Sequence, residues 1–283
     1  MEYLGIGFPK NRVRPALLPH HIYTMYTYLS YMDERFRNKV ICGDALEVMR
    51  SIPSGSFDCI VTSPPYNLRT TTSGGFHPAK EGRTRPYLAD GYDGYTDDMP
   101  EDEYEAWQNE CLKEMYRIVK DDGGAIFYNH RWRSQNSQWQ MRERIFDGIP
   151  IRQVIIWHKG PGICGNYTCF MQAYEVIYLI TKPGFRLLPK KSGYTNVWTI
   201  DKHCDVDWHP APFPEEIPRR ALDSTGAKSV LDPFAGSGTT LAVAKRMGVD
   251  YCGIDQSRQY CDRIEERLAS VSASRRTLES YVD

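Results

Sequence analysis

Residues 230–240 read VLDPFAGSGTT, an apolar strand segment that runs through a glycine-containing loop into a helical pattern. Gly236 and Gly238 allow the backbone to turn sharply and leave room for a ligand against the N-terminus of the helix. The next strand, at 250–254, is followed by Asp255, whose carboxylate is well placed to accept hydrogen bonds from ribose hydroxyls. The stretch therefore indicates a cofactor site, although nicotinamide enzymes share this pattern, with a third glycine that is missing here.

Apolar strand segments alternate with helical patterns along most of the chain. The predicted strands lie at 39–42, 57–62, 124–128, 152–157, 175–180, 229–232 and 250–254. The predicted helices lie at about 45–51, 102–119, 134–146, 215–224, 238–247 and 257–270. Such alternation implies an α/β fold with a Rossmann-like, doubly wound, mostly parallel sheet covered by helices on both faces.

A second motif, VTSPPYNLRTTT at residues 61–72, ends the second of these strands. Pro64 and Pro65 have no backbone N–H, so they cannot continue a central strand. In the order TSPPY then DPFAGSGTT, the two motifs resemble the β-class, circularly permuted, of S-adenosylmethionine-dependent amino methyltransferases of DNA. The resemblance runs from about Val40 to Leu268 and includes ICGDALEVM (41–49), DDGGAIFYN (121–129), QVIIWHK (153–159) and HPAPFP (209–214). It implies a permuted methyltransferase topology, with both motifs at the carboxyl edge of one sheet.

The resemblance implies a catalytic role for each residue of the proline motif. The Ser63 side chain and the Pro64 carbonyl would accept hydrogen bonds from the exocyclic amine of a base and localise the nitrogen lone pair. Pro65 would help hold the turn rigid, and Tyr66 would offer its ring face to a base flipped out of the duplex. Methylation of a ring carbon needs a cysteine nucleophile, typically next to proline, and the chain has no Pro-Cys dipeptide.

The cofactor residues are likewise implied by the resemblance. They are Asp232, Phe234, Gly236, Gly238 and Thr239 for the methionine portion of S-adenosylmethionine, Asp255 for the ribose and Asp44 for the adenine amino group. Asp44 is also placed to cap the helix that begins near Ala45, and the two roles are compatible. His209 and Phe213 belong to the segment that closes over the cofactor in this family.

The target base and the DNA contacts are less determined. Ser63 before Pro-Pro, and the Phe-Pro of HPAPFP, resemble cytosine-N4 members, whereas Asn67 after Tyr66 resembles adenine-N6 members. We favour adenine N6 and keep cytosine N4 as the alternative. Residues 160–208 are the predicted target-recognition region, and the long loop 67–101 is predicted to be mobile and to order over the DNA. The expected DNA contacts, to phosphates or to bases, are Asn67, Arg69, Arg186, Lys190 and Lys191.

The chain is therefore divided into three parts. Residues 1–38 read as an arm and an amphipathic helix at about 20–37, a possible dimer contact; residues 39–270 form the methyltransferase domain; and 271–283 form a flexible tail. We predict a homodimer that acts on double-stranded DNA.

Composition and motifs limit the location and the functions that the protein can have. The 283 residues carry a net charge of -1, no apolar run long enough to cross a bilayer and no signal-peptide pattern, so a cytoplasmic protein is expected. Residues 203–209 include metal-capable side chains without a second ligand pair, and no metal site is predicted.

Alternative functions explain less of the sequence. A nicotinamide oxidoreductase would leave the proline motif without a role. A non-catalytic DNA-binding regulator and a methyltransferase for glutamine amides in proteins are further alternatives. No nuclease motif is evident, so any restriction partner would be a separate chain.

Overall fold

The computed structural model describes residues 32–67, 93, 97–135, 138–160, 170–189, 193–202 and 206–272. They form a sheet of eight strands in the order β1-β10-β9-β2-β3-β7-β6-β8. The strands are β1 (Lys39–Cys42), β2 (Cys59–Thr62), β3 (Ala125–His130), β6 (Ile151–His158), β7 (Tyr174–Thr181), β8 (Val197–Thr199), β9 (Ser229–Asp232) and β10 (Asp250–Asp255). Neighbouring strands are parallel, except that β7 runs antiparallel to both β3 and β6. The predicted α/β class with a mostly parallel sheet is confirmed.

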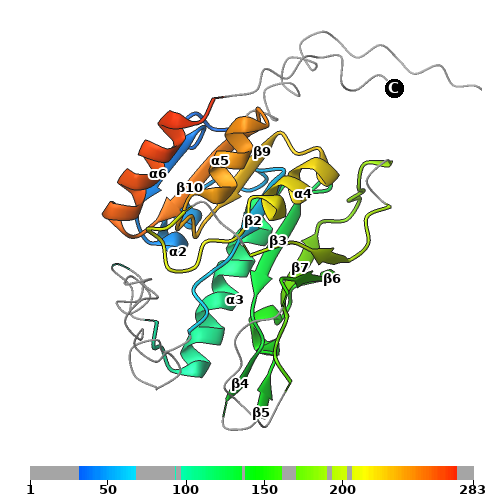
Figure 1. The fold of residues 1–283 in the computed structure, drawn as a ribbon. Helices are drawn as coiled ribbons and strands as arrows, with labels where there is room; N and C mark the ends of the chain where they lie inside the picture. The colour runs from blue at the N-terminus through cyan, green and yellow to red at the C-terminus, as the bar shows by residue number, and fades with distance from the viewer. Residues whose placement is uncertain are drawn as a thin grey trace, which may run out of the picture. The chain divides into compact units, whose positions relative to one another are not determined.

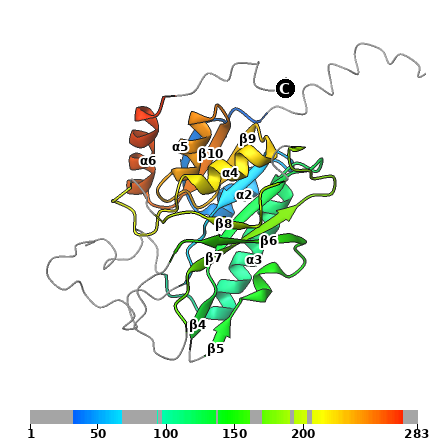
Figure 2. The ribbon, with the colours of Figure 1, turned by 45° about the vertical axis from the view of Figure 1, so that its right-hand side comes forward.

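Helices cover both faces of the sheet (Figures 1 and 2). One face carries α2 (Ala45–Ser51) and α3 (Glu101–Ile118), and the other carries α4 (Glu216–Thr225), α5 (Thr239–Arg246) and α6 (Arg258–Ser270). Alternate side chains of the central strands serve the two cores: Cys59 and Val61 of β2 pack toward α4 and α5, whereas Ile60 packs toward α2 and α3. A parallel strand buried on both faces is apolar at successive positions, which is why β2 could be recognised in the sequence.

The sheet order brings distant parts of the chain to one edge. β2 lies between β9 and β3, so the proline motif after β2 and the glycine loop after β9 leave neighbouring strands at their carboxyl ends. Because β7 is antiparallel, it contributes its first residues, not its last, to the same edge. This edge therefore gathers the ends of β1, β10, β9, β2, β3, β6 and β8 with the start of β7.

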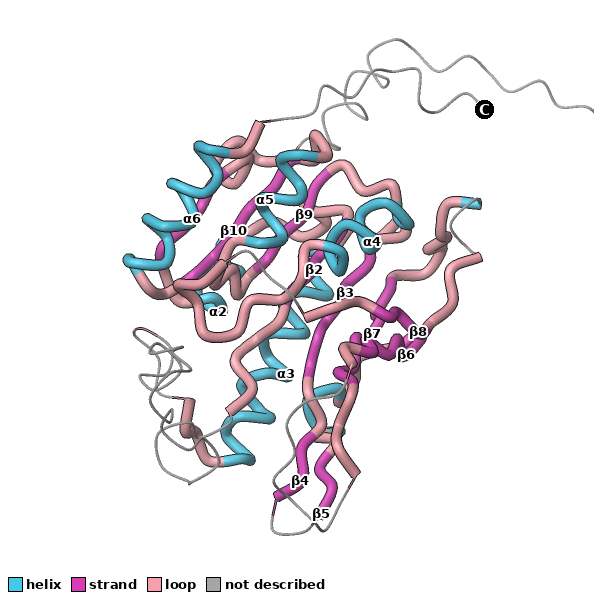
Figure 3. The backbone as a smooth tube through the Cα atoms, viewed as in Figure 1, coloured by secondary structure: helices cyan, strands magenta, loops and turns pink. Residues whose placement is uncertain are grey.

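One predicted helix is wrong in the described residues. The helix expected at 134–146 is a two-stranded hairpin, β4 (Arg133–Gln135) with β5 (Gln138–Gln140), followed by the 3₁₀ turn η2 (Glu143–Phe146). Figure 3 traces this hairpin beyond the end of β3. Arg142 has a left-handed φ of 55°, which ends any helix there.

The helix expected at about 20–37 is described only at its end, where residues 34–38 form a turn; residues 1–31 lie outside the described part. The strand β8 was not predicted, and β1 is a partly exposed edge strand instead of a buried one. Among the described helices, none combines the length and the apolar character needed to span a membrane.

Candidate active site

A side-chain hydrogen bond joins the two sequence motifs at the carboxyl edge of the sheet. Thr62, the last residue of β2, donates from Oγ1 to Asp232 Oδ1 at the end of β9, over 2.7 Å and across 170 positions of sequence. Thr240 at the start of α5 donates to the Val61 carbonyl at 3.3 Å. The proline motif and the glycine loop are therefore fixed to each other as one site.

The Ser-Pro-Pro-Tyr turn is held from behind by hydrogen bonds to its carbonyl groups. Pro65 accepts from the Tyr104 hydroxyl at 2.7 Å, and Tyr66 accepts from Arg142 Nη1 at 2.5 Å. Within the described residues no hydrogen bond reaches the Pro64 carbonyl. Pro64 therefore keeps the open acceptor that the predicted catalytic role requires.

Arg142 is the anchor behind this turn. Its side chain is almost fully buried, forms an ion pair with Glu101 over 2.6 Å and lies 4.5 Å above the ring of Tyr104. A buried guanidinium needs such partners, because an unpaired buried charge is costly. The sequence did not single out Arg142, whose left-handed backbone also ends the region predicted as helix.

The Ser63 and Tyr66 side chains enter a buried polar network. Ser63 Oγ lies 2.7 Å from Tyr66 Oη, and Asn129 Nδ2 donates to Tyr66 Oη at 2.6 Å and to Glu175 Oε2 at 3.0 Å. Glu175 pairs through its other oxygen with Lys159. The Tyr66 ring is 8% exposed, with its centroid 5.1 Å from that of His130.

Sequence reasoning missed Asn129, Lys159 and Glu175. Asn129 lies near the carboxyl end of β3, Lys159 follows β6, and Glu175 is the second residue of β7. Polar residues at strand ends were a usable signal for the first two, since ligands of α/β sheets bind at the carboxyl ends of strands. Glu175 gave no such signal, because the direction of β7 was unknown.

The Asn67 side chain holds the backbone of the segment before α3. Its side chain is fully buried, and its amide donates to the Met99 carbonyl and accepts from the Met99 N–H, each at 2.8 Å. Its φ of 54° is left-handed, a conformation that asparagine tolerates. Its backbone N–H donates to Asp97. The predicted DNA contact of Asn67 is thus not supported, because the side chain is used to hold the chain before α3.

The glycine loop has the close packing expected of a cofactor loop. Gly236 has φ +50°, and a Cβ there would lie 2.7 Å from His209 Nε2; a Cβ on Gly238 (φ +71°) would lie 2.8 Å from Ile264 of α6. His209 is buried, and burial lowers its pKa to about 3, so the ring is neutral. Its Nδ1 accepts from the Ala211 N–H, which leaves the proton on Nε2 beside Gly236.

Asp232 is the buried carboxylate of the loop. Oδ1 accepts from Thr62 and from the Phe234 N–H, whereas Oδ2 has no hydrogen-bond partner among the described residues. Burial raises the pKa of Asp232 to about 6. A buried carboxylate with an unpartnered oxygen fits a ligand that brings a positive charge or an N–H donor, and S-adenosylmethionine has both a sulfonium and an amino group.

Asp255 and Asp44 lie side by side, because β10 pairs with β1 and the Gly43 N–H donates to the Asp255 carbonyl. The Asp255 carboxylate accepts from the N–H groups of Gly236 (2.8 Å) and Ser257 (2.9 Å), and burial raises its pKa. A carboxylate offers about four acceptor sites, so room for ribose hydroxyls remains. Asp44 is exposed and caps α2 by accepting from the Glu47 N–H, which confirms the predicted cap.

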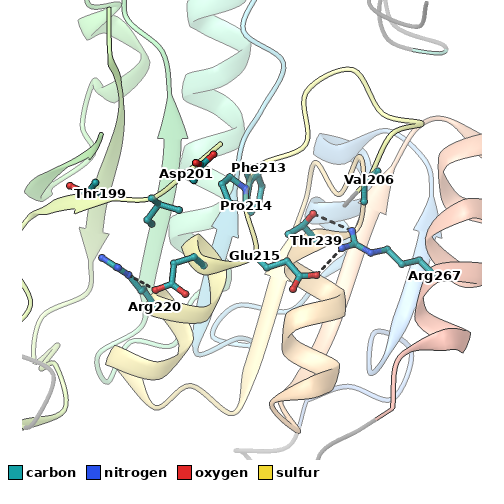
Figure 4. Close-up of a pocket in the computed structure, with 11 residues that line it drawn as sticks. Thr199, Asp201, Val206, Phe213, Pro214, Glu215, Arg220, Thr239 and Arg267 are labelled. Atoms are coloured by element: carbon teal, nitrogen blue, oxygen red, sulfur yellow. Dashed lines mark hydrogen bonds and ion pairs between the residues drawn. The ribbon is translucent and has the colours of Figure 1, made fainter. Parts of the chain in front are cut away.

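An open cavity of about 400 Å³ lies between the glycine loop and α4 (Figure 4). Phe213 and Thr239 line it, but the other predicted cofactor residues do not. Arg267 of α6 forms part of the wall and donates to the Ser237 carbonyl at 2.8 Å and to Thr239 Oγ1 at 3.2 Å. The cavity therefore adjoins one end of the predicted cofactor site and does not contain the proline motif.

The predicted DNA-binding residues are not brought together. Arg186 follows the end of β7, which pairs with the start of β3, so it lies at the opposite edge of the sheet from Ser63. Arg69, Lys190 and Lys191 lie outside the described residues. The described parts of the predicted recognition region 160–208 are also divided: 170–173 precede the start of β7 and 200–202 follow the end of β8 at the site edge, whereas 182–189 follow the far end of β7.

No group of three or more histidine, cysteine or acidic side chains suited to a metal ion occurs in the described part of the chain. Of the metal-capable stretch 203–209, residues 203–205 lie outside it.

The chain resembles known proteins over most of its length. A family model described as DNA methylase (N6_N4_Mtase) matches residues 57–266. Type II methyltransferase M.BglII of Bacillus subtilis is 25% identical over 285 residues, which cover 87% of this chain and 71% of the relative. A putative DNA modification methylase from Thermus thermophilus was solved complexed with S-adenosyl-L-methionine; it is 24% identical with a TM-score of 0.57, covering 82% of this chain and 93% of that one. PvuII DNA methyltransferase (cytosine-N4-specific) gives 17% identity and a TM-score of 0.63, covering 90% of both chains.

Proposed function

The chain belongs to the N6/N4 family of DNA methylases, and from this premise we propose that it methylates the exocyclic N6 amine of adenine in double-stranded DNA. Its cofactor is S-adenosylmethionine. The observation that carries the proposal is the hydrogen bond from Thr62 to Asp232, which holds the acceptor turn beside the cofactor loop. Neither motif alone specifies methyl transfer to an amine.

The residues present fit the cofactor. Asp44, Asp255 and Asp232 would hold its adenine, ribose and methionine parts in that order along the strand ends, and Gly236 would let its chain pass close to the loop. When bound, the cofactor supplies an electrophilic methyl group on a sulfonium.

The chain's own contribution is to orient the amine. Ser63 Oγ and the Pro64 carbonyl each accept a hydrogen bond from one N–H group of the amine. These two hydrogen bonds localise the nitrogen lone pair toward the cofactor. These acceptors are preorganised, since Tyr104 and Arg142 fix the turn through the next two carbonyl groups. The ring of Tyr66 would stack on the flipped base, which must leave the duplex to reach the site.

Cytosine N4 is the second candidate. Serine in front of Pro-Pro and the Phe213–Pro214 pair favour it, while Asn67 favours adenine by resemblance alone, because its buried side chain holds Met99 and not a base. Either amine requires the same two acceptors.

The test is to incubate the protein with unmodified bacterial genomic DNA and labelled S-adenosylmethionine, and to identify labelled nucleosides by mass spectrometry. We expect the label in N6-methyladenine. Label in N4-methylcytosine would show instead that the protein methylates cytosine N4. The Ser63→Ala variant should lose roughly a hundredfold or more in rate, as for loss of one preorganised hydrogen-bonding group. Ser51→Ala, at the exposed end of α2, is the matched control. A protein that binds cofactor and DNA but labels neither base would be a non-catalytic regulator.

A homodimer is part of the proposal and depends on residues outside the described part. Sedimentation that shows only monomer at micromolar concentration would contradict it.

A further inference from the structure

The buried pair of Glu175 and Lys159 lies directly behind the acceptor turn, and the methyl-transfer chemistry described above does not use it. Glu175 is 8% exposed, and its Oε2 is 3.0 Å from Asn129 Nδ2 and 3.3 Å from Tyr66 Oη. Its Oε1 pairs with Lys159. A buried ion pair contributes little to stability on average, so its position beside Tyr66 calls for another explanation.

The hydrogen bonds have a direction. The Asn129 amide N–H and the Lys159 ammonium can only donate, and the Glu175 carboxylate can only accept. When the Tyr66 hydroxyl donates to Glu175, the Ser63 hydroxyl donates to Tyr66 over 2.7 Å. Asn129 Nδ2 donates a long hydrogen bond to Ser63 Oγ at 3.5 Å, so one lone pair of Ser63 remains to accept the N–H of a target amine.

We propose that Glu175 is the terminal proton acceptor of a relay that runs from Ser63 through Tyr66, an inference that rests on the proposed function. The amine nitrogen must lose one proton as its bond to the methyl group forms, and a serine hydroxyl alone is too weak a base to take that proton in the transfer step. Ser63 Oγ takes that proton as its own proton passes to Tyr66 Oη, and the tyrosine proton passes to Glu175 Oε2. One N–H bond breaks, the carboxyl O–H forms, and no electrons are gained or lost by the protein.

Asn129 and Lys159 are positioning residues in this relay. Asn129 holds the Tyr66 and Glu175 oxygens together by donating to both. The Lys159 ammonium offsets the charge of the buried Glu175 carboxylate.

The test is the single-turnover rate of methyl transfer as a function of pH, for wild-type protein and Glu175→Gln, on DNA that the wild type labels. The variant keeps the size of the side chain but cannot take the proton. We expect a loss of about 10²–10⁴ at pH 7, the usual range for a lost general base. We also expect a rate that rises with pH where the wild-type rate is flat, since hydroxide must then take the proton. Affinities for cofactor, by calorimetry, and for DNA, by anisotropy, should not change.

The control is Glu114→Gln, a partly buried carboxylate on α3 that pairs with Arg117 and should leave rate and pH profile unchanged. Tyr66→Phe keeps the ring face and removes the central hydroxyl, and it gives a second reading if Glu175→Gln does not fold. A wild-type rate in Tyr66→Phe, or a slowed Glu175→Gln with an unchanged pH profile, overturns the relay. A wild-type protein that labels no base overturns the proposed function and the relay together.

Discussion

Replacing Asp232 with asparagine should weaken cofactor binding and, at the same time, change how the stability of the free protein depends on pH. The carboxylate is fully buried with one unpartnered oxygen, and burial raises its pKa to about 6. The folded state therefore prefers the neutral acid, whereas the unfolded chain ionises near 3.8. This is the pattern of a group kept for ligand binding at a cost in stability.

The size of the effect follows from the two pKa values. A carboxyl that titrates near 6 in the folded protein and 3.8 in the unfolded chain contributes about 3 kcal/mol of stability below pH 3.8, and that contribution is lost as the pH rises through 6. Most of it is absent at pH 8, and about 1.4 kcal/mol of it has returned at pH 5. Asparagine does not titrate, so its stability relative to wild type should be about 1.4 kcal/mol more favourable at pH 8 than at pH 5.

The assay is urea unfolding of both proteins at pH 8 and pH 5, without cofactor, together with calorimetric titration of S-adenosylmethionine at pH 8. The difference between the two pH values removes the constant effect of burying a new amide N–H. Titration of groups that do not interact with Asp232, including His209, is common to both proteins and cancels. A free-energy difference that is the same at both pH values would refute the assignment of Asp232 as a strained buried acid, and unchanged cofactor affinity would refute its role in binding.

Three further predictions follow from the glycine loop and the proline motif. Because burial lowers the pKa of His209 to about 3, the stability it contributes above pH 6.5 should be lost as the pH falls toward 3, and His209→Gln should flatten that part of an acid-unfolding curve. Gly236→Ala should abolish cofactor binding detected by calorimetry, since its Cβ would meet the His209 ring, whereas Gly148→Ala, with a similar positive φ and open space, should show only the backbone strain of about 1 kcal/mol. Asn67→Ala should lower the free energy of unfolding by about 2–4 kcal/mol, because both backbone groups of Met99 lose a buried partner, and a loss below 1 kcal/mol would contradict that role.

The parts of the site that could be predicted from the sequence are those marked by proline or glycine residues. Pro64, Pro65 and the two loop glycines interrupt apolar strands, and such interruptions can be read without knowing the fold. Asp255 was recognised from its place at the end of a strand, whereas the adenine role of Asp44 was implied by the resemblance. The sequence did not predict that these two residues lie close together, which follows from the β1–β10 pairing.

Other parts of the site depend on pairings that no local pattern encodes. Glu175 lies in an otherwise apolar strand, and only the antiparallel direction of β7 brings it beside Tyr66. Arg186 was predicted to bind DNA from its charge and from its place between QVIIWHK and HPAPFP, and the same strand direction carries it to the far edge. The 134–146 helix failed because Trp139 and Met141 are exposed and form no buried stripe, and because Arg142 is held in a left-handed turn by Glu101.

The order of the strands also bears on how the protein is made. In the described sheet the edge strand β1 pairs with β10, and β2 pairs with β9 on one side. Strands from the first quarter of the chain therefore pair with strands from its last quarter, which are synthesised much later. A nascent chain leaving the ribosome can pair β2 with β3 early, but the edge strand stays unpaired until residues 250–255 have emerged. Such long-range pairing is slow and leaves apolar strand edges open meanwhile. From the arrangement that unites the two halves of the site, we therefore expect the newly synthesised protein to expose unpaired strand edges until its last strand is complete.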